Sequence, residues 1–120
     1  MEPFAHLHVH TQYSILDGQC NIAKIFNKAA ADGMPGMAVT DHGNMFGIKE
    51  FFDVAKSKNK SLEKEGKPRC KPIFGCEVYC ARRSHTRREA KIDMSGWHLI
   101  LLAKNQTGYH NLVKLVSKGW

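Results

Sequence analysis

The sequence is poor in the features that build disulfide scaffolds and membrane spans. It has four cysteines in 120 residues, and none forms a C-x-x-C pair, so idle thiols are a better interpretation than a zinc or redox motif. The longest apolar run, residues 99–103, falls far short of the roughly 20 residues that a bilayer requires. Residues 1–3 lack the basic start of a signal peptide. We therefore expect a cytoplasmic protein.

Acidic residues are also scarce, since 11 of them face 18 lysines and arginines and leave a formal net charge of +7. This excess makes an anionic partner such as nucleic acid plausible, although charge alone says nothing about fold. The positive charge gathers in residues 56–71 and 82–91, which we interpret as solvated loops first and contact surfaces second. The second stretch has no aromatic residue to stack on bases among its four arginines: Arg82, Arg83, Arg87 and Arg88.

Apolar periodicity predicts alternating strands and helices. We expect strands at residues 4–9, 36–40, 72–79 and 97–103. Helices are predicted from Asn21 to Gly33, from Ile48 with fading order after Lys56, and from Asn105 or Thr107 onward. This order is typical of an α/β fold with parallel strands. Because four strands cannot close an eight-unit barrel, the chain is either a small open sheet or, as we favour, the truncated front part of a larger fold.

The stretch FAHLHVHT, residues 4–11, carries three histidines at alternate positions. Independent placement would produce such a run with a probability of only about 0.02. Residues two apart on a strand share a face, so His8 and His10 can present ring nitrogens to one point. Asp17 follows in the next loop, and the later strands end near His42 and Glu77. These nitrogen and oxygen donors suit zinc, manganese or iron.

Blander interpretations apply to several of these residues. Isolated histidines such as His85 and His110 are more often surface residues than ligands. His6 lies deeper in the predicted strand, where holding a ligand in place is its expected role. Asp41 either caps the following helix or ends a strand, or it orients a neighbouring imidazole. Glu77 lies on an otherwise apolar strand, and a neighbouring cation would explain this costly carboxylate.

Three strings occur in register along the chain: FAHLHVHTQYSILDG at residues 4–18, GMAVTDHGNMFG at 36–47 and HLILLAKNQTGYHNLVKLVS at 98–117. Together with Gly75-Cys76-Glu77 they resemble the PHP (polymerase and histidinol phosphatase) superfamily. Within it they are most similar to the domains that begin the alpha subunits of bacterial DNA polymerase III. The resemblance extends over nearly the whole chain.

The resemblance implies the amino-terminal part of a distorted seven-stranded β/α barrel, with up to three metal ions held by nine ligands. The positions that match in this sequence are His8, His10, Asp17, His42, Glu77 and His98. The other three ligands would follow Trp120. Zinc is the expected metal, with manganese, magnesium or iron as alternatives. One carry-over strains the geometry, because His98 stands at the amino end of its predicted strand. Residues 57–69 are longer than a compact crossover needs, and we interpret them as a surface insertion that the family tolerates.

The resemblance also implies a function within a replicative DNA polymerase, with DNA and other replisome subunits as partners. Clustered divalent ions can lower the pKa of a bound water and stabilise a leaving oxygen, so we expect phosphoester hydrolysis of the 3′–5′ exonuclease kind. The polymerase carboxylates are absent, and this piece alone should not polymerise DNA. Two alternatives stay open: a free-standing phosphatase of the histidinol-phosphate type, and a metal that only stabilises the fold and its neighbouring domains.

Overall fold

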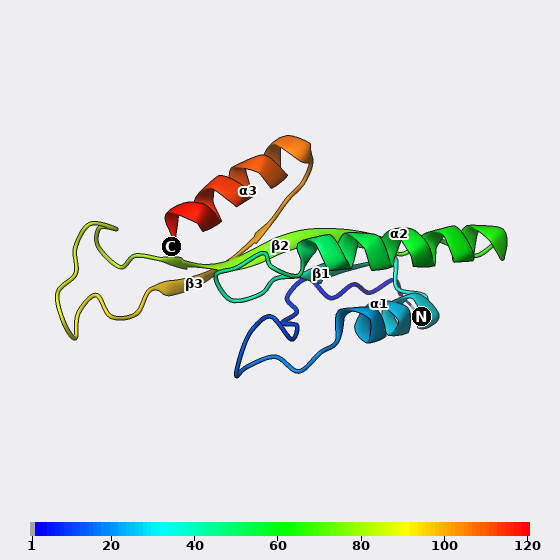
Figure 1. The fold of residues 1–120 in the computed structure, drawn as a ribbon, viewed down its shortest axis with the longest axis horizontal. Coiled ribbons are helices and arrows are strands. Elements are labelled where there is room, and N and C mark those ends of the chain that lie inside the picture. The colour runs from blue at the N-terminus through cyan, green and yellow to red at the C-terminus, as the bar shows by residue number, and fades with distance from the viewer. Residues whose placement is uncertain (1) are drawn as a thin grey trace.

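The computed structural model describes residues 2–120 and has three helices around a three-stranded sheet (Figure 1). In chain order the elements are α1 (Ile22–Ala31), β1 (Gly36–Val39), α2 (Ile48–Lys64), β2 (Lys71–Cys80), β3 (Trp97–Leu102) and α3 (Gln106–Lys118). The predicted α/β class is confirmed. Among the described residues, no helix is long and apolar enough to cross a membrane.

The sheet is mixed, with β2 in its centre. The first half of β2 pairs in parallel with β1, from Gly36 opposite Lys71 to Val39 opposite Phe74. Its second half pairs with β3 in the antiparallel sense, from Gly75 opposite Leu102. The expectation of parallel strands throughout is therefore wrong for β3. Parallel pairing needs a crossover, usually a helix, and residues 81–96 contain none, so the chain simply turns back on β2.

The predicted strand at residues 4–9 is only partly formed. His6 makes an isolated parallel bridge with Met37, and its carbonyl accepts a hydrogen bond from the Ala38 amide at 2.8 Å. Further on, the amide of Val9 donates to the Thr40 hydroxyl at 2.9 Å rather than to a backbone carbonyl. The segment thus runs extended beside β1 without a regular ladder.

The core lies between α1, α2 and the parallel half of the sheet. Asn21 caps α1 by accepting a hydrogen bond from the Lys24 amide, as its residue type predicts. The Phe26 side chain is fully buried and meets the ring of Phe51 from α2 edge-on, with centroids 5.5 Å apart. Apolar residues at helical spacing are therefore buried in both helices, whereas Phe52 of α2 stays 46% exposed.

Helix α2 continues to Lys64, so the expectations that this helix fades after Lys56 and that residues 56–71 form a solvated loop are wrong for most of that stretch. Most of residues 57–69 are exposed, and their interpretation as a surface insertion stays a prediction. Asn59 and Leu62 remain buried one turn apart. The side-chain amide nitrogen of Asn59 donates to the backbone carbonyl of Cys70 at 2.8 Å. The side-chain oxygen of Asn59 accepts from the backbone amide of Cys70 at 2.9 Å. These contacts tie a largely polar helix to the start of β2.

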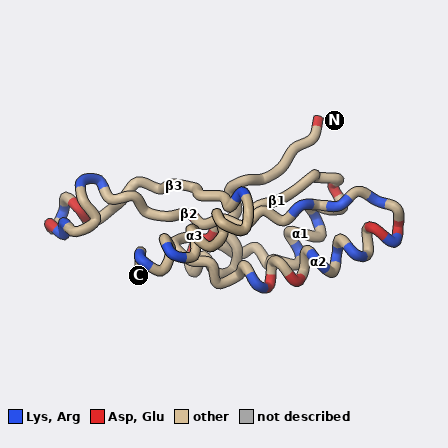
Figure 2. Tube along the Cα trace, turned by 90° about the horizontal axis from the view of Figure 1, so that it is seen from above, with Lys and Arg blue, Asp and Glu red and all other residues tan. Residues whose placement is uncertain are grey.

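The loop at residues 81–96 projects from the end of the β2–β3 pair (Figure 1). Basic residues gather at its tip and along α2, and acidic residues lie beside them (Figure 2). Arg83 pairs with Asp93 at 2.5 Å, and the guanidinium of Arg82 lies 4.7 Å from the centre of the Trp97 ring. Two of the four arginines in this loop are thus held by contacts within the chain.

Candidate metal centre

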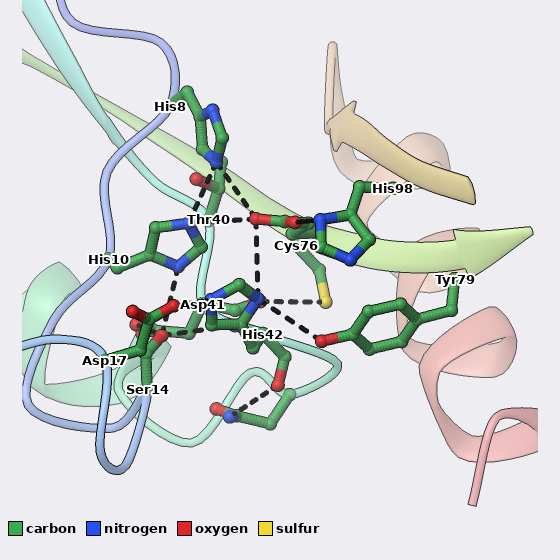
Figure 3. A network of polar contacts seen from close by, with 12 residues as sticks. His8, His10, Ser14, Asp17, Thr40, Asp41, His42, Cys76, Tyr79 and His98 are labelled. Atoms are coloured by element: carbon green, nitrogen blue, oxygen red, sulfur yellow. Dashed lines mark hydrogen bonds and ion pairs between the residues drawn. The ribbon is translucent and has the colours of Figure 1, made fainter. Parts of the chain in front are cut away.

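The centre forms where β1 ends beside the middle of β2 (Figure 3). An isolated parallel bridge between His42 and Glu77 extends the pairing of these strands. The amide of Glu77 donates to the carbonyl of Asp41 at 3.1 Å, and the amide of Gly43 donates to the carbonyl of Glu77 at 2.8 Å. Backbone hydrogen bonds therefore hold His42 beside Glu77.

Glu77 is the middle of the cluster, and its side chain is only 1% exposed. Its Oε2 lies 2.9 Å from His8 Nε2, 2.8 Å from His10 Nε2 and 3.5 Å from His42 Nδ1. Its Oε1 lies 2.5 Å from His98 Nδ1. One buried carboxylate thus meets four imidazoles from three segments of the chain, because His8 and His10 share one segment (Figure 3).

The surroundings set the charge of the central groups. Burial on its own would raise the pKa of Glu77, but the hydrogen bond with His8 and the charges of the other imidazoles outweigh it and hold the pKa below its ordinary value. Burial and then the neighbouring His42 lower the pKa of His10. An anionic carboxylate and a neutral imidazole are the forms that bind a metal ion.

A count of hydrogens shows that the cluster suits a cation. The Nε2 atoms of His8 and His10 are 2.9 Å apart, and both lie within 2.9 Å of Glu77 Oε2, so three close contacts join three atoms. An ionised carboxylate carries no hydrogen, and each Nε2 carries at most one. At most two of the three contacts can therefore be hydrogen bonds. A metal ion shared by the three donors would satisfy all of them.

Asp17 reaches the cluster because its loop folds back. A Cβ atom at Gly18 would lie 2.1 Å from the carbonyl oxygen of Thr11, so only glycine permits this close return of the chain. The Asp17 carboxylate then forms an ion pair with His42 Nε2. The His42 ring also stacks on His10, with centroids 4.0 Å apart. A second group of donors therefore adjoins the first.

Asp41 faces away from the cluster and is 1% exposed. It accepts hydrogen bonds from the Thr11 amide at 2.6 Å, the Thr11 hydroxyl at 2.8 Å and the Ser14 hydroxyl at 2.6 Å. Ser14 Oγ lies 3.1 Å from His10 Nδ1. Helix α2 is instead preceded by Gly47, without a side-chain cap. Asp41 therefore does not cap α2, and the geometry favours contact with the His10 imidazole through Ser14.

The arrangement of histidines and carboxylates coincides with a match to a known family. Residues 6–120 match the PHP domain family. The chain belongs to the PHP domain family. The match covers every side chain of the cluster, and it confirms the resemblance on which the six ligand positions were predicted.

Relatives of this PHP domain carry the name DNA polymerase III subunit alpha. A DNA polymerase III subunit alpha of Borreliella burgdorferi is 44% identical over 115 residues, which cover 95% of this chain. The proteins of the same name from Treponema pallidum and Thermus aquaticus are 42% and 40% identical, each over 98% of the chain. The chain spans about 9% of the length of each of these three relatives.

The structure brings together the six side chains that the sequence predicted as ligands. They fall into one continuous set of contacts around the PHP domain's buried carboxylate: His8, His10, Asp17, His42, Glu77 and His98. It does not bring His6 there, because that side chain is exposed and its ring packs edge-on against Phe4 at 4.8 Å. A role for His6 in holding a ligand is not supported by this position.

Two side chains of the site were missed in the sequence. The Tyr79 hydroxyl lies 3.3 Å from His42 Nδ1, and burial together with the nearby Glu77 charge raises the pKa of Tyr79. A signal for it existed, because residues two apart on β2 share a face. Ser14 has no such signal, since a serine in a polar loop is ordinary.

Proposed function

We propose that the chain binds divalent metal ions at this centre. The ligands would be the six predicted side chains, His8, His10, Asp17, His42, Glu77 and His98. The observation that carries the proposal is the triangle of close donor atoms from His8, His10 and Glu77, which protons alone cannot satisfy. Imidazole nitrogens mixed with carboxylate oxygens favour zinc, with manganese or iron next and magnesium, which prefers oxygen ligands, last.

The side chains have separate roles in this proposal. Glu77, fixed by the backbone of β2, supplies the central anionic oxygen, and its burial excludes water from one side of the site. The Asp17–His42 pair supplies donors for an adjacent ion. Divalent ions bound here would polarise a phosphoryl oxygen and lower the pKa of a water molecule. The substrate class that fits is a phosphate ester.

We further propose that the chain is the amino-terminal part of a PHP domain in a DNA polymerase III alpha subunit. The support is identity of about 40% to several such subunits over nearly the whole chain. On this proposal the chain forms the first part of a distorted seven-stranded barrel, three ligands follow residue 120, and the whole protein is a cytoplasmic DNA-directed DNA polymerase. Its partners would be DNA and replisome subunits, including a proofreading or clamp partner. Residues 1–120 alone should not polymerise DNA.

Within that protein the centre would support hydrolysis of the 3′–5′ exonuclease kind or stabilise the polymerase. A free-standing phosphatase of the histidinol-phosphate type is the alternative, and hydrolysis of small phosphomonoesters would favour it. The central place of Glu77, which contacts side chains from several segments, gives the stabilising role a structural basis.

The test compares the full-length protein with a His8→Ala, His10→Ala variant and with His110→Ala as the control. His110 is exposed on α3, where its ring meets Gln106. We expect the double variant to lose bound zinc and exonuclease activity on a mismatched primer, and the control to retain both. If exonuclease activity is equal in all three proteins and only the melting temperature of the double variant falls, the metal is structural. Equal metal content in all three would refute the proposed centre.

A further inference from the structure

Ser14 lies between the buried carboxylate of Asp41 and the metal centre. Its side chain is 1% exposed, and its hydroxyl oxygen has three polar neighbours (Figure 3). These are Asp41 Oδ1 at 2.6 Å, His10 Nδ1 at 3.1 Å and the amide nitrogen of His42 at 3.1 Å. A serine hydroxyl offers one hydrogen and two lone pairs, so three neighbours use its full capacity.

The direction of each bond follows from the other partners. A carboxylate only accepts, and Asp41 is held in that role by the amide and the hydroxyl of Thr11. The single hydrogen of Ser14 therefore points to Asp41. The backbone amide of His42 can only donate, so it occupies one lone pair of Ser14. The remaining lone pair faces His10 Nδ1, and that nitrogen must bring the hydrogen.

We propose that Ser14 is a positioning residue that places a hydrogen on Nδ1 of His10 and leaves Nε2 as the nitrogen that faces the metal. The inference rests on the proposed metal centre and deepens it. The partner of one ring nitrogen decides which nitrogen is free to bind a metal. Asp41 acts through Ser14 in the same way that a carboxylate often acts directly on a ligand histidine.

The arrangement also fixes the ring in space. His10 is held at Nδ1 by Ser14, and its Nε2 lies 2.8 Å from Glu77 Oε2. The same serine oxygen accepts from the backbone of His42, whose ring stacks on His10. One hydroxyl therefore aligns two of the proposed ligands. Loss of the hydroxyl should weaken metal binding although no ligand is removed.

The direct test is nitrogen NMR of the protein labelled with ¹⁵N-histidine, with and without one equivalent of zinc. We expect the His10 signals to show a hydrogen on Nδ1 in both states, and a shift of Nε2 on addition of zinc. A hydrogen on Nε2 with a bare Nδ1 would overturn the role of Ser14. Absence of any zinc-dependent shift would instead refute the metal centre, while the position of the hydrogen would still decide the role of Ser14.

Variants supply the second measurement. Ser14→Ala should lower zinc affinity by about 10- to 100-fold, the usual loss for a group that orients a ligand, and should let the His10 hydrogen move to Nε2. Ser14→Thr keeps the hydroxyl and should restore both properties. Asn59→Ala removes buried hydrogen bonds far from the centre, so it should lower stability without changing zinc affinity. If Ser14→Ala binds zinc as tightly as Asn59→Ala, the proposal is wrong.

Discussion

Replacement of Glu77 by glutamine should abolish most of the stabilisation that zinc gives to the fold. Glutamine keeps the size of the side chain but removes its negative charge and half of its accepting capacity. Glu77 contacts four imidazoles and is the only carboxylate in the triangle of donor atoms formed with His8 and His10. We therefore expect zinc binding to weaken by about 100-fold, the largest loss that is usual when a supporting group is removed.

The magnitude follows from linkage between binding and folding. Zinc at about 100 times its dissociation constant stabilises the folded protein by about 2.7 kcal/mol. If loss of the carboxylate weakens binding by about 100-fold, at the upper limit for a supporting group, the same zinc concentration gives only about 0.4 kcal/mol. For a domain of this size, 1 kcal/mol corresponds to roughly 3–5 °C in melting temperature. The zinc-dependent shift should fall from roughly 10 °C to about 2 °C.

The assay is thermal unfolding of each protein with zinc and with a chelator, so that each variant is its own reference. Glu50→Gln is a matched control, because Glu50 accepts a hydrogen bond from the Tyr13 hydroxyl at 2.7 Å and lies outside the contacts of the centre. It should keep the full zinc-dependent shift. A shift in Glu77→Gln equal to that of the control, or no shift in the original protein, would refute the reasoning.

Three further predictions concern the rest of the fold. Phe26→Ala should lower the free energy of unfolding by about 3–5 kcal/mol, because Phe26 is fully buried; urea titration measures this, and a loss below 1 kcal/mol, roughly the cost of a surface change, would contradict the packing. The hydrogen bond from Arg83 lowers the pKa of Asp93, so the stabilisation of the loop is present above the ordinary aspartate pKa and is lost as pH falls through the lowered value. Arg83→Ala should therefore raise the pKa of Asp93 in a carboxyl NMR titration, and an unchanged pKa would show that the pair is absent in solution. Burial raises the pKa of Cys76 to about 11, so iodoacetamide should modify the exposed Cys80 and spare Cys76 in the folded protein; equal modification by mass spectrometry would count against the burial of Cys76.

The local elements were predictable because their signals are local. Asn21 and Asn105 cap α1 and α3 through side-chain bonds to amides three residues on, and the apolar faces of the helices follow the helical period. The end of α2 was not predictable from hydrophobic spacing. Its last turns are mostly polar and are held by Asn59, whose partner is the backbone of a distant cysteine. Such a contact exists only after the chain has folded.

The direction of β3 explains how His98 reaches the centre, which the predicted parallel topology did not allow. In a parallel sheet His98 would lie at the edge opposite the cluster, since it is near the amino end of its strand. Because β3 is antiparallel, its amino end meets the carboxyl end of β2, and His98 lies opposite Tyr79 in the register. Its Nδ1 then reaches Glu77. The composition of a strand does not show whether it pairs in the parallel or the antiparallel sense. His98 was therefore predicted as a ligand from its residue type and position, although the predicted parallel topology placed it at the wrong edge.

Neighbouring residues in the chain divide two tasks at the end of β1. The side chain of Asp41 points into the loop of residues 11–14 and organises it through Thr11 and Ser14. The side chain of His42 points the other way, to Glu77 and Asp17. Because extended residues alternate in direction, one dipeptide can both hold in place the loop that follows His10 and contribute a donor to the same centre. The site is therefore built by strand geometry together with its hydrogen bonds, and a shift of β1 by one residue would turn the side chain at position 42 away from Glu77 and Asp17.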